Sequence, residues 1–115
     1  MPHTQSLSPE VAQCIDDCDH CSSTCNTTIG HCLEKGGSHA EAHHIALMLD
    51  CAAICRTASE SMSRSSSVHR DICRVCAEIC RQCETDCRSF GDDSTMQECA
   101  DVCGKCAYSC EQMSA

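Results

Sequence analysis

Aromatic residues are nearly absent from this chain of 115 residues, which contains one Phe, one Tyr and no Trp. Domains of this size usually rely on large aromatic side chains to fill their interior. Cysteine, with 16 residues, is the abundant alternative, because a free thiol behaves as a small and often buried apolar group. The composition therefore predicts one domain, residues 1–115, whose interior is filled largely by sulfur.

Long apolar runs and basic clusters are also missing. The longest apolar run is Ile45 to Leu49, far short of a membrane span, and residues 1–11 contain no apolar segment of the kind found in a secretory signal. The formal net charge is −9 and Lys or Arg form no run, so nucleic acid is not expected as a partner. We therefore expect a cytoplasmic protein with reduced thiols and no membrane association.

Turn signals divide the chain into four segments. Lys35–Ser38 contains two glycines, Ser63–Ser67 is rich in serine, and Phe90–Ser94 reads Phe-Gly-Asp-Asp-Ser. Segments of about 20 to 27 residues with short links between them are typical of antiparallel helices in a bundle. We expect Ser8 to cap the first helix and a capping box of Ser94 and Gln97 to start the fourth. The expected helices span about residues 9–35, 39–63, 67–89 and 95–113.

The cysteines follow the period of an α-helix. The run CRVCAEICRQCETDC, residues 73–87, places five of them at gaps of 3, 4, 3 and 4, and every gap within a segment is 3, 4 or 7. This is the a/d pattern of a heptad repeat, which puts the thiols of each helix on one face. The sequence therefore predicts an all-α protein, an antiparallel four-helix bundle with a cysteine-lined core. The core thiols are Cys14, Cys18, Cys21, Cys25, Cys32, Cys51, Cys55, Cys73, Cys76, Cys80, Cys83, Cys87, Cys99, Cys103, Cys106 and Cys110.

Metal binding is the chemistry that best suits such a core. Disulfides along one helix are disfavoured, because Cβ atoms at i, i+3 or i, i+4 lie about 5–6 Å apart and a disulfide needs about 3.5–4.5 Å. Zinc and iron–sulfur sites usually use tight loops, and neither Cys-x-Cys nor the ferredoxin spacing occurs. Cu(I) is soft, accepts two or three thiolates, and at one ion per thiolate leaves the core near neutral. Cu(I) is the favoured ion, and sequestration of zinc or mixed soft metals is the alternative.

A thiol redox sensor or enzyme is the third hypothesis. Such a protein needs one activated Cys-x-x-Cys at a helix N-terminus, which lowers the pKa of the thiol. The cysteines here are numerous and lie within the expected helices. We therefore expect a binding protein and not an enzyme.

The pattern resembles the bacterial copper storage proteins, a family of cysteine-rich four-helix bundles. The resemblance covers residues 10–113 and rests on the runs CAAIC (51–55), CRVCAEICRQCETDC (73–87) and CADVCGKCAYSC (99–110). It implies cytosolic storage of multiple Cu(I) ions, a homotetramer, and a mouth of His and Met side chains where copper enters. The second segment departs from the pattern, because it has only two cysteines. The expected partners are copper ions and other copies of the chain, with a copper chaperone or an efflux regulator as further candidates.

Histidine and methionine are expected at both ends of the bundle. One end gathers His44, Met48 and Met96 beside Cys32 and Cys87. Imidazole and thioether groups bind copper without a thiolate, so they suit its entry. We expect this end to be the mouth, with His44, Met48 and Met96 as copper ligands in addition to the cysteines. The same end also has His31, His39 and His43 nearby, so the opposite end has fewer such groups: Met62, His69 and Met113.

Overall fold

The computed structural model describes residues 7–115, and residues 1–6, which belong to the predicted domain, lie outside the described part. Four helices and a short 3-10 turn make up this range. They are α1 (Pro9–Lys35), η2 (Gly37–Ala40), α2 (Ala42–Ser63), α3 (His69–Arg88) and α4 (Ser94–Ser114). No strand occurs between residues 7 and 115, and the prediction of an all-α fold is confirmed.

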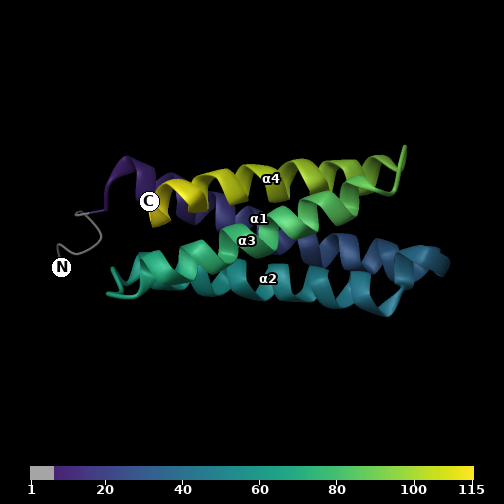
Figure 1. Cartoon of the computed structure of the whole chain (residues 1–115), viewed down its shortest axis with the longest axis horizontal. Helices are drawn as coiled ribbons and strands as arrows, with labels where there is room; N and C mark the ends of the chain where they lie inside the picture. Colours follow the sequence, from purple (N-terminus) through teal and green to yellow (C-terminus); the bar gives the residue numbers. More distant parts are fainter. Residues whose placement is uncertain (1–6) are drawn as a thin grey trace.

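The helices form an elongated antiparallel bundle of 49 × 24 × 21 Å (Figure 1). α1 packs against α2 and α4, and α3 packs against the same two helices. Each helix therefore has two neighbours and one partner across the diagonal, the arrangement of an up-down-up-down bundle with short connections. One face of every helix points toward the common axis.

Local hydrogen bonds fix the ends of the first two helices. The Ser8 hydroxyl accepts the backbone N–H of Val11 at 3.1 Å, and Pro9 occupies the first helical position. α1 ends where Gly36 takes up a φ of +72°, which favours glycine. α2 begins at Ala42 and not at residue 39 as expected, because η2 occupies residues 37–40 and the Glu41 carboxylate caps the helix.

The predicted capping box at the start of α4 is wrong. Asp93, and not Ser94, precedes the helix, and its Oδ1 accepts the backbone N–H groups of Thr95 and Met96 at 3.0 and 3.3 Å. The side-chain amide of Gln97 donates instead to a backbone carbonyl of the α3–α4 turn at 2.5 Å. The cap of α4 is therefore a carboxylate with a second oxygen left for other partners.

Sulfur fills the interior of the bundle. All sixteen cysteines are buried, and none has more than 1% of its surface exposed. Buried alanines accompany them, and the hydroxyl of Ser22 on α1 reaches the carbonyl of Ala52 on α2 at 2.9 Å, because the small side chains let these helices approach closely. Ile, Leu and Val side chains flank the thiols and are partly buried. The predicted antiparallel four-helix bundle with a cysteine-lined core is confirmed.

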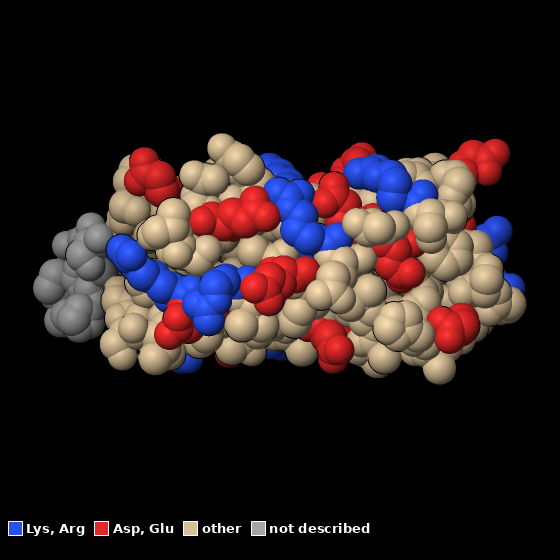
Figure 2. Space-filling view, in the orientation of Figure 1, with Lys and Arg blue, Asp and Glu red and all other residues tan. Residues whose placement is uncertain are grey.

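The surface carries charges of both signs. Figure 2 shows acidic and basic side chains intermixed over one face. Exposed ion pairs join α3 to α4, with Arg81 at 2.8 Å from Glu111 and Arg88 at 2.8 Å from Asp101. Such exposed pairs contribute little to stability. Among residues 7–115, no helix is both long and apolar enough to cross a membrane.

Candidate metal centre

The buried thiols are all free, and most of them lie within hydrogen-bond distance of another thiol. Their closest Sγ–Sγ separations, between Cys18 and Cys110 and between Cys55 and Cys80, are 3.5 Å. A disulfide has an S–S bond of about 2.05 Å, so these contacts are thiol–thiol hydrogen bonds. The interior is thus a set of reduced sulfurs, most of which lie close enough to a neighbouring sulfur to share a proton or a metal ion.

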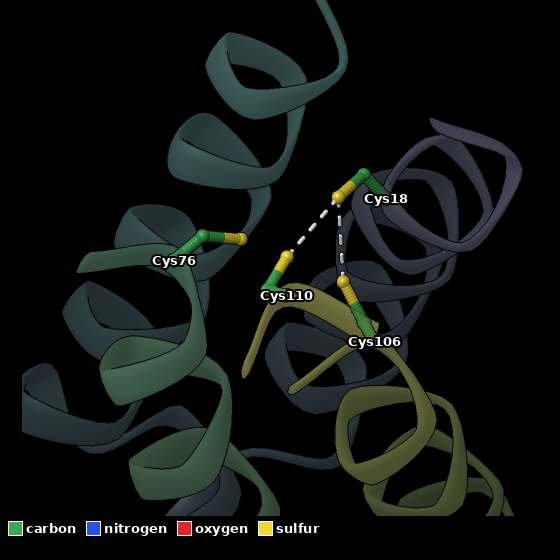
Figure 3. Close-up of side chains that lie close together, drawn as sticks. All are labelled: Cys18, Cys76, Cys106 and Cys110. Carbon is green, nitrogen blue, oxygen red and sulfur yellow. Dashed lines mark hydrogen bonds between the residues drawn. The ribbon is translucent and has the colours of Figure 1, made fainter. Parts of the chain in front are cut away.

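Thiols from different helices converge on common points. Cys18 of α1 lies 3.7 Å from Cys106 and 3.5 Å from Cys110, both on α4, and Cys76 of α3 points into the same space (Figure 3). Cys55 of α2 connects α2 with α3 and α4. Its Sγ atom lies 3.7, 3.5 and 3.7 Å from those of Cys76, Cys80 and Cys106. All four helices therefore contribute ligand atoms to one region.

Three groups of four cysteines could each hold a metal ion, since their sulfurs lie within 4.8 Å of one another. Cys106 belongs to two of these groups, and so does Cys21. The groups are therefore not separate sites but overlapping parts of one column of sulfur. They are Cys18, Cys76, Cys106 and Cys110; Cys21, Cys55, Cys80 and Cys106; and Cys21, Cys25, Cys51 and Cys103.

Burial and hydrogen bonding change how the thiols ionise. Burial raises the pKa of Cys32 to about 11. The pKa of Cys55 is also raised, because its thiol shares a hydrogen bond with that of Cys106 and because the site is buried. A metal ion that binds these groups must displace their protons, so its affinity depends on pH.

At the end of the bundle where α1 ends and α4 begins, the column contains other ligand types besides thiols. The Sγ atom of Cys32 lies 3.3 Å from Nε2 of His44 and 3.6 Å from Sδ of Met96. Met48 is fully buried one turn further along α2. The structure thus brings Cys32, His44 and Met96 together, and thiol, imidazole and thioether groups meet at one end of the bundle.

The sequence did not identify two residues that support this end. The Asp86 carboxylate accepts a hydrogen bond from Nδ1 of His44, which leaves Nε2 of that ring free to face Cys32. The ring of Phe90 packs against the ring of His44 with a centroid distance of 4.7 Å. Asp86 lies off the heptad positions, whereas Phe90 follows Cys87 by three residues and so continues the spacing, although it lies beyond the end of α3.

The opposite end of the bundle is built differently. Nδ1 of His69 donates to the carbonyl of Ser66 at 2.9 Å, which ties the ring to the loop before α3. Met62 is buried at this end, whereas Met113 is only partly buried. The end with His44 therefore has three buried nitrogen and sulfur ligands, whereas only Met62 is buried among those of the opposite end.

A four-helix bundle built around a continuous column of free thiols defines a protein that binds soft metal ions. Comparison with known proteins narrows this class. A sequence model described as copper storage protein matches residues 7–115, so the chain belongs to the copper storage protein family.

Solved structures of similar sequence share the whole bundle. The protein Nmul_A1745 from Nitrosospira multiformis is 42% identical with a TM-score of 0.86, and the match covers 91% of this chain and 94% of that one. The copper storage protein BsCsp3, in a Cu(I)-bound form, is 36% identical with a TM-score of 0.85, and the match covers 92% and 99%. A cytosolic copper storage protein from Streptomyces lividans, loaded with five coppers, is 26% identical with a TM-score of 0.79, and the match covers 91% and 92%.

Proposed function

We propose that this protein stores and buffers multiple Cu(I) ions in the cytosol and holds them by thiolates inside the bundle. The observation that carries the proposal is the continuous column of sixteen buried, free cysteines. A metal–thiolate bond of about 2.3 Å in a trigonal arrangement separates the sulfurs by about 4 Å. The observed thiol contacts of 3.5 to 4.0 Å already approach this spacing, so little rearrangement is needed.

Charge favours Cu(I) over zinc. Each Cu⁺ replaces one thiol proton, so equal numbers of ions and thiolates leave the core neutral. Zinc held by four thiolates keeps two negative charges at each site, and an uncompensated buried charge is costly. The overlap at Cys21 and Cys106 also prevents the three groups from filling as isolated tetrahedral sites.

The proposed ligands are the sixteen cysteines together with His44, Met48 and Met96. The thiolates hold most of the ions, and the neutral imidazole and thioether groups bind more weakly at the mouth. The 3.3 Å contact between Nε2 of His44 and Sγ of Cys32 supports a path from the mouth to the first thiol. The role is storage, with no catalytic step assigned to any side chain.

The proposed partners are other copies of the chain and a protein that exchanges copper with it. Leu33 and Leu49 are 58% and 50% exposed and offer apolar surface for a homotetramer. A copper chaperone or an efflux regulator would supply or receive the ions. The cytosolic relative from Streptomyces lividans supports the same location for this protein.

Anaerobic titration of the reduced, metal-free protein with Cu(I), followed by gel filtration and metal analysis, tests the proposal. The expected plateau is on the order of 16 ions per chain, because bridging thiolates allow one ion for each cysteine. A plateau near three ions, one for each four-cysteine group, would reject storage and favour discrete structural sites. The same titration with Zn²⁺ decides between the two metals, since the proposal requires Cu(I) to displace zinc from the thiols.

A further inference from the structure

Two histidines and an aspartate meet outside the column of thiols. Nε2 of His31 and Nε2 of His39 each lie 2.9 Å from the same oxygen of Asp93, its Oδ2. His31 lies near the end of α1, His39 lies in η2, and Asp93 precedes α4. Three segments of the chain thus bring their ligand atoms within 4.8 Å of one another.

This cluster is accessible to solvent, whereas the thiols are not. The side chains of His31, His39 and Asp93 are 27%, 18% and 14% exposed. The ring of Phe90 packs on His39 at a centroid distance of 4.4 Å and on His44 at 4.7 Å, so it lies between the cluster and the mouth ligand. An ion could therefore reach the cluster without entering the core.

The two contacts with Asp93 are close to the spacing of ligand atoms on a metal. Tetrahedral zinc with bonds of about 2.0–2.1 Å separates its ligand atoms by about 3.3 Å, so the observed 2.9 Å contacts need to open by only a few tenths of an ångström. The carboxylate has the freedom to take part, because Oδ1 caps α4 while Oδ2 faces the imidazoles. Binding would therefore leave the helix cap intact.

The donor set selects a different metal from the one in the core. Two imidazoles and a carboxylate suit borderline divalent ions such as Zn²⁺ and Co²⁺, whereas Cu(I) prefers thiolate and thioether sulfur. Three protein ligands also leave one tetrahedral position open for water.

We propose that His31, His39 and Asp93 form a site for one divalent transition-metal ion, separate from the Cu(I) store. An ion bound there joins the end of α1, η2 and the start of α4 beside the mouth. The site does not depend on the proposed storage of copper, because its ligands are distinct from the thiols.

Co²⁺ distinguishes this site from the thiols, because thiolate–cobalt bonds give intense ultraviolet charge-transfer bands that nitrogen and oxygen ligands lack. The reduced full-length protein and its double variant His31→Asn/His39→Asn are each saturated with Co²⁺, and the bound metal is counted after gel filtration. The expected result is the loss of one ion per chain in the variant with unchanged thiolate bands. Equal binding by the two proteins, or a parallel loss of thiolate bands, would overturn the proposal.

Two further variants separate metal binding from a structural role. Asp93→Asn keeps an oxygen that can cap α4 but removes the ligating carboxylate, so it should also lose the ion while its thermal unfolding without metal stays near that of the wild type. His20→Asn/His43→Asn changes two exposed histidines and should bind cobalt like the wild type. Retention of the ion by Asp93→Asn would exclude Asp93 as a ligand and overturn the proposed three-residue site.

A second titration uses protein first saturated with Cu(I), so that the thiols are occupied. We expect this form to bind one Zn²⁺ per chain through the same three residues, with shifted ring signals of His31 and His39 in the NMR spectrum. Failure to load Cu(I) would be detected by metal analysis before zinc is added and would count against storage alone. If zinc shifts the ring signals of His31 and His39 neither in the Cu(I)-saturated protein nor in the copper-free protein, this result would count against the divalent site alone.

Discussion

Cys55 shows how a single thiol can serve several ions. Its sulfur contacts those of Cys76, Cys80 and Cys106 at 3.5 to 3.7 Å, and these neighbours come from both α3 and α4. A thiolate in this position would bridge two Cu(I) ions and not hold one alone. More ions should therefore depend on the Cys55 thiolate than on a thiolate that binds one ion.

We predict that Cys55→Ala lowers the Cu(I) capacity by more than one ion per chain, because a bridging thiolate is lost. The metal-free protein should lose only about 1 kcal/mol of stability, since the change removes one small buried group. Anaerobic Cu(I) titration measures the capacity, and urea unfolding followed by circular dichroism measures the stability.

Cys73→Ala is the matched control. Cys73 is equally buried but lies outside the three groups of four cysteines. Its loss should lower the capacity by at most one ion. A similar decrease in Cu(I) capacity for both variants would show that Cys55 bridges no more ions than Cys73 does.

Heptad position predicted which side chains enter the core but not what surrounds them. His44, Met48 and Met96 lie on the same helix faces as the cysteines, and all three are buried. The spacing predicted this because it fixes the face of the helix on which a residue lies. The contact of Asp86 with His44 depends on how α3 packs against α2, and that of Phe90 depends on how the α3–α4 turn folds. Residue spacing carries no information on that arrangement.

Among the elements, α2 has the fewest thiols yet keeps the same buried face. The buried face of α2 continues on either side of its two cysteines through other side chains: His44, Met48, Ser59 and Met62. Periodicity therefore predicted the helices from sequence. Their ends were harder to predict, because a 3-10 turn or a neighbouring carboxylate can replace the expected cap.

The start of α4 gives a direct test of such a replacement. Asp93→Ala should destabilise the metal-free protein by about 1 kcal/mol, since two backbone N–H groups lose their acceptor. Ser94→Ala should have almost no effect, because Ser94 is the first residue of the helix and not its cap. Urea unfolding of the two variants side by side measures the difference, and an equal cost would mean that the capping box forms in solution.

At the scale of the whole molecule, the bundle packs thiols where other domains pack aromatic rings. Neutral thiols behave as small apolar groups, so we expect the reduced protein to be helical without metal. A far-UV circular dichroism spectrum of a random coil that becomes helical only with metal would contradict this expectation.

The stability of the metal-free bundle should fall at alkaline pH. Burial raises the pKa of Cys32 from 9.0 to about 11, so the folded state holds this proton more tightly than the unfolded chain does. The resulting stabilisation is fully present below about pH 9 and is lost as the pH rises to about 11. Urea unfolding of the reduced protein across this range should show the decrease, whereas the copper-loaded protein, whose thiolates carry no proton, should not show it.

The two ends of the bundle should differ in how fast copper crosses them. We predict that His44→Gln, Met48→Leu and Met96→Leu together slow loading and removal of Cu(I) roughly tenfold, the scale on which outer groups alter metal binding. The capacity should stay nearly intact, because the thiolates that hold most of the ions are unchanged. Stopped-flow transfer from a weak Cu(I) donor, under exclusion of oxygen, measures both directions.

The matched triple variant at the opposite end is Met62→Leu, His69→Gln and Met113→Leu. It removes the same types of side chain, and Leu retains most of the volume of Met, so any general effect of the substitutions on packing should be similar. If Cu(I) transfer is faster for this variant than for the triple variant of His44, Met48 and Met96, the mouth lies beside Cys32. The reverse order would place it at the end where α1 begins, and equal, unchanged rates would mean that ions enter between the helices.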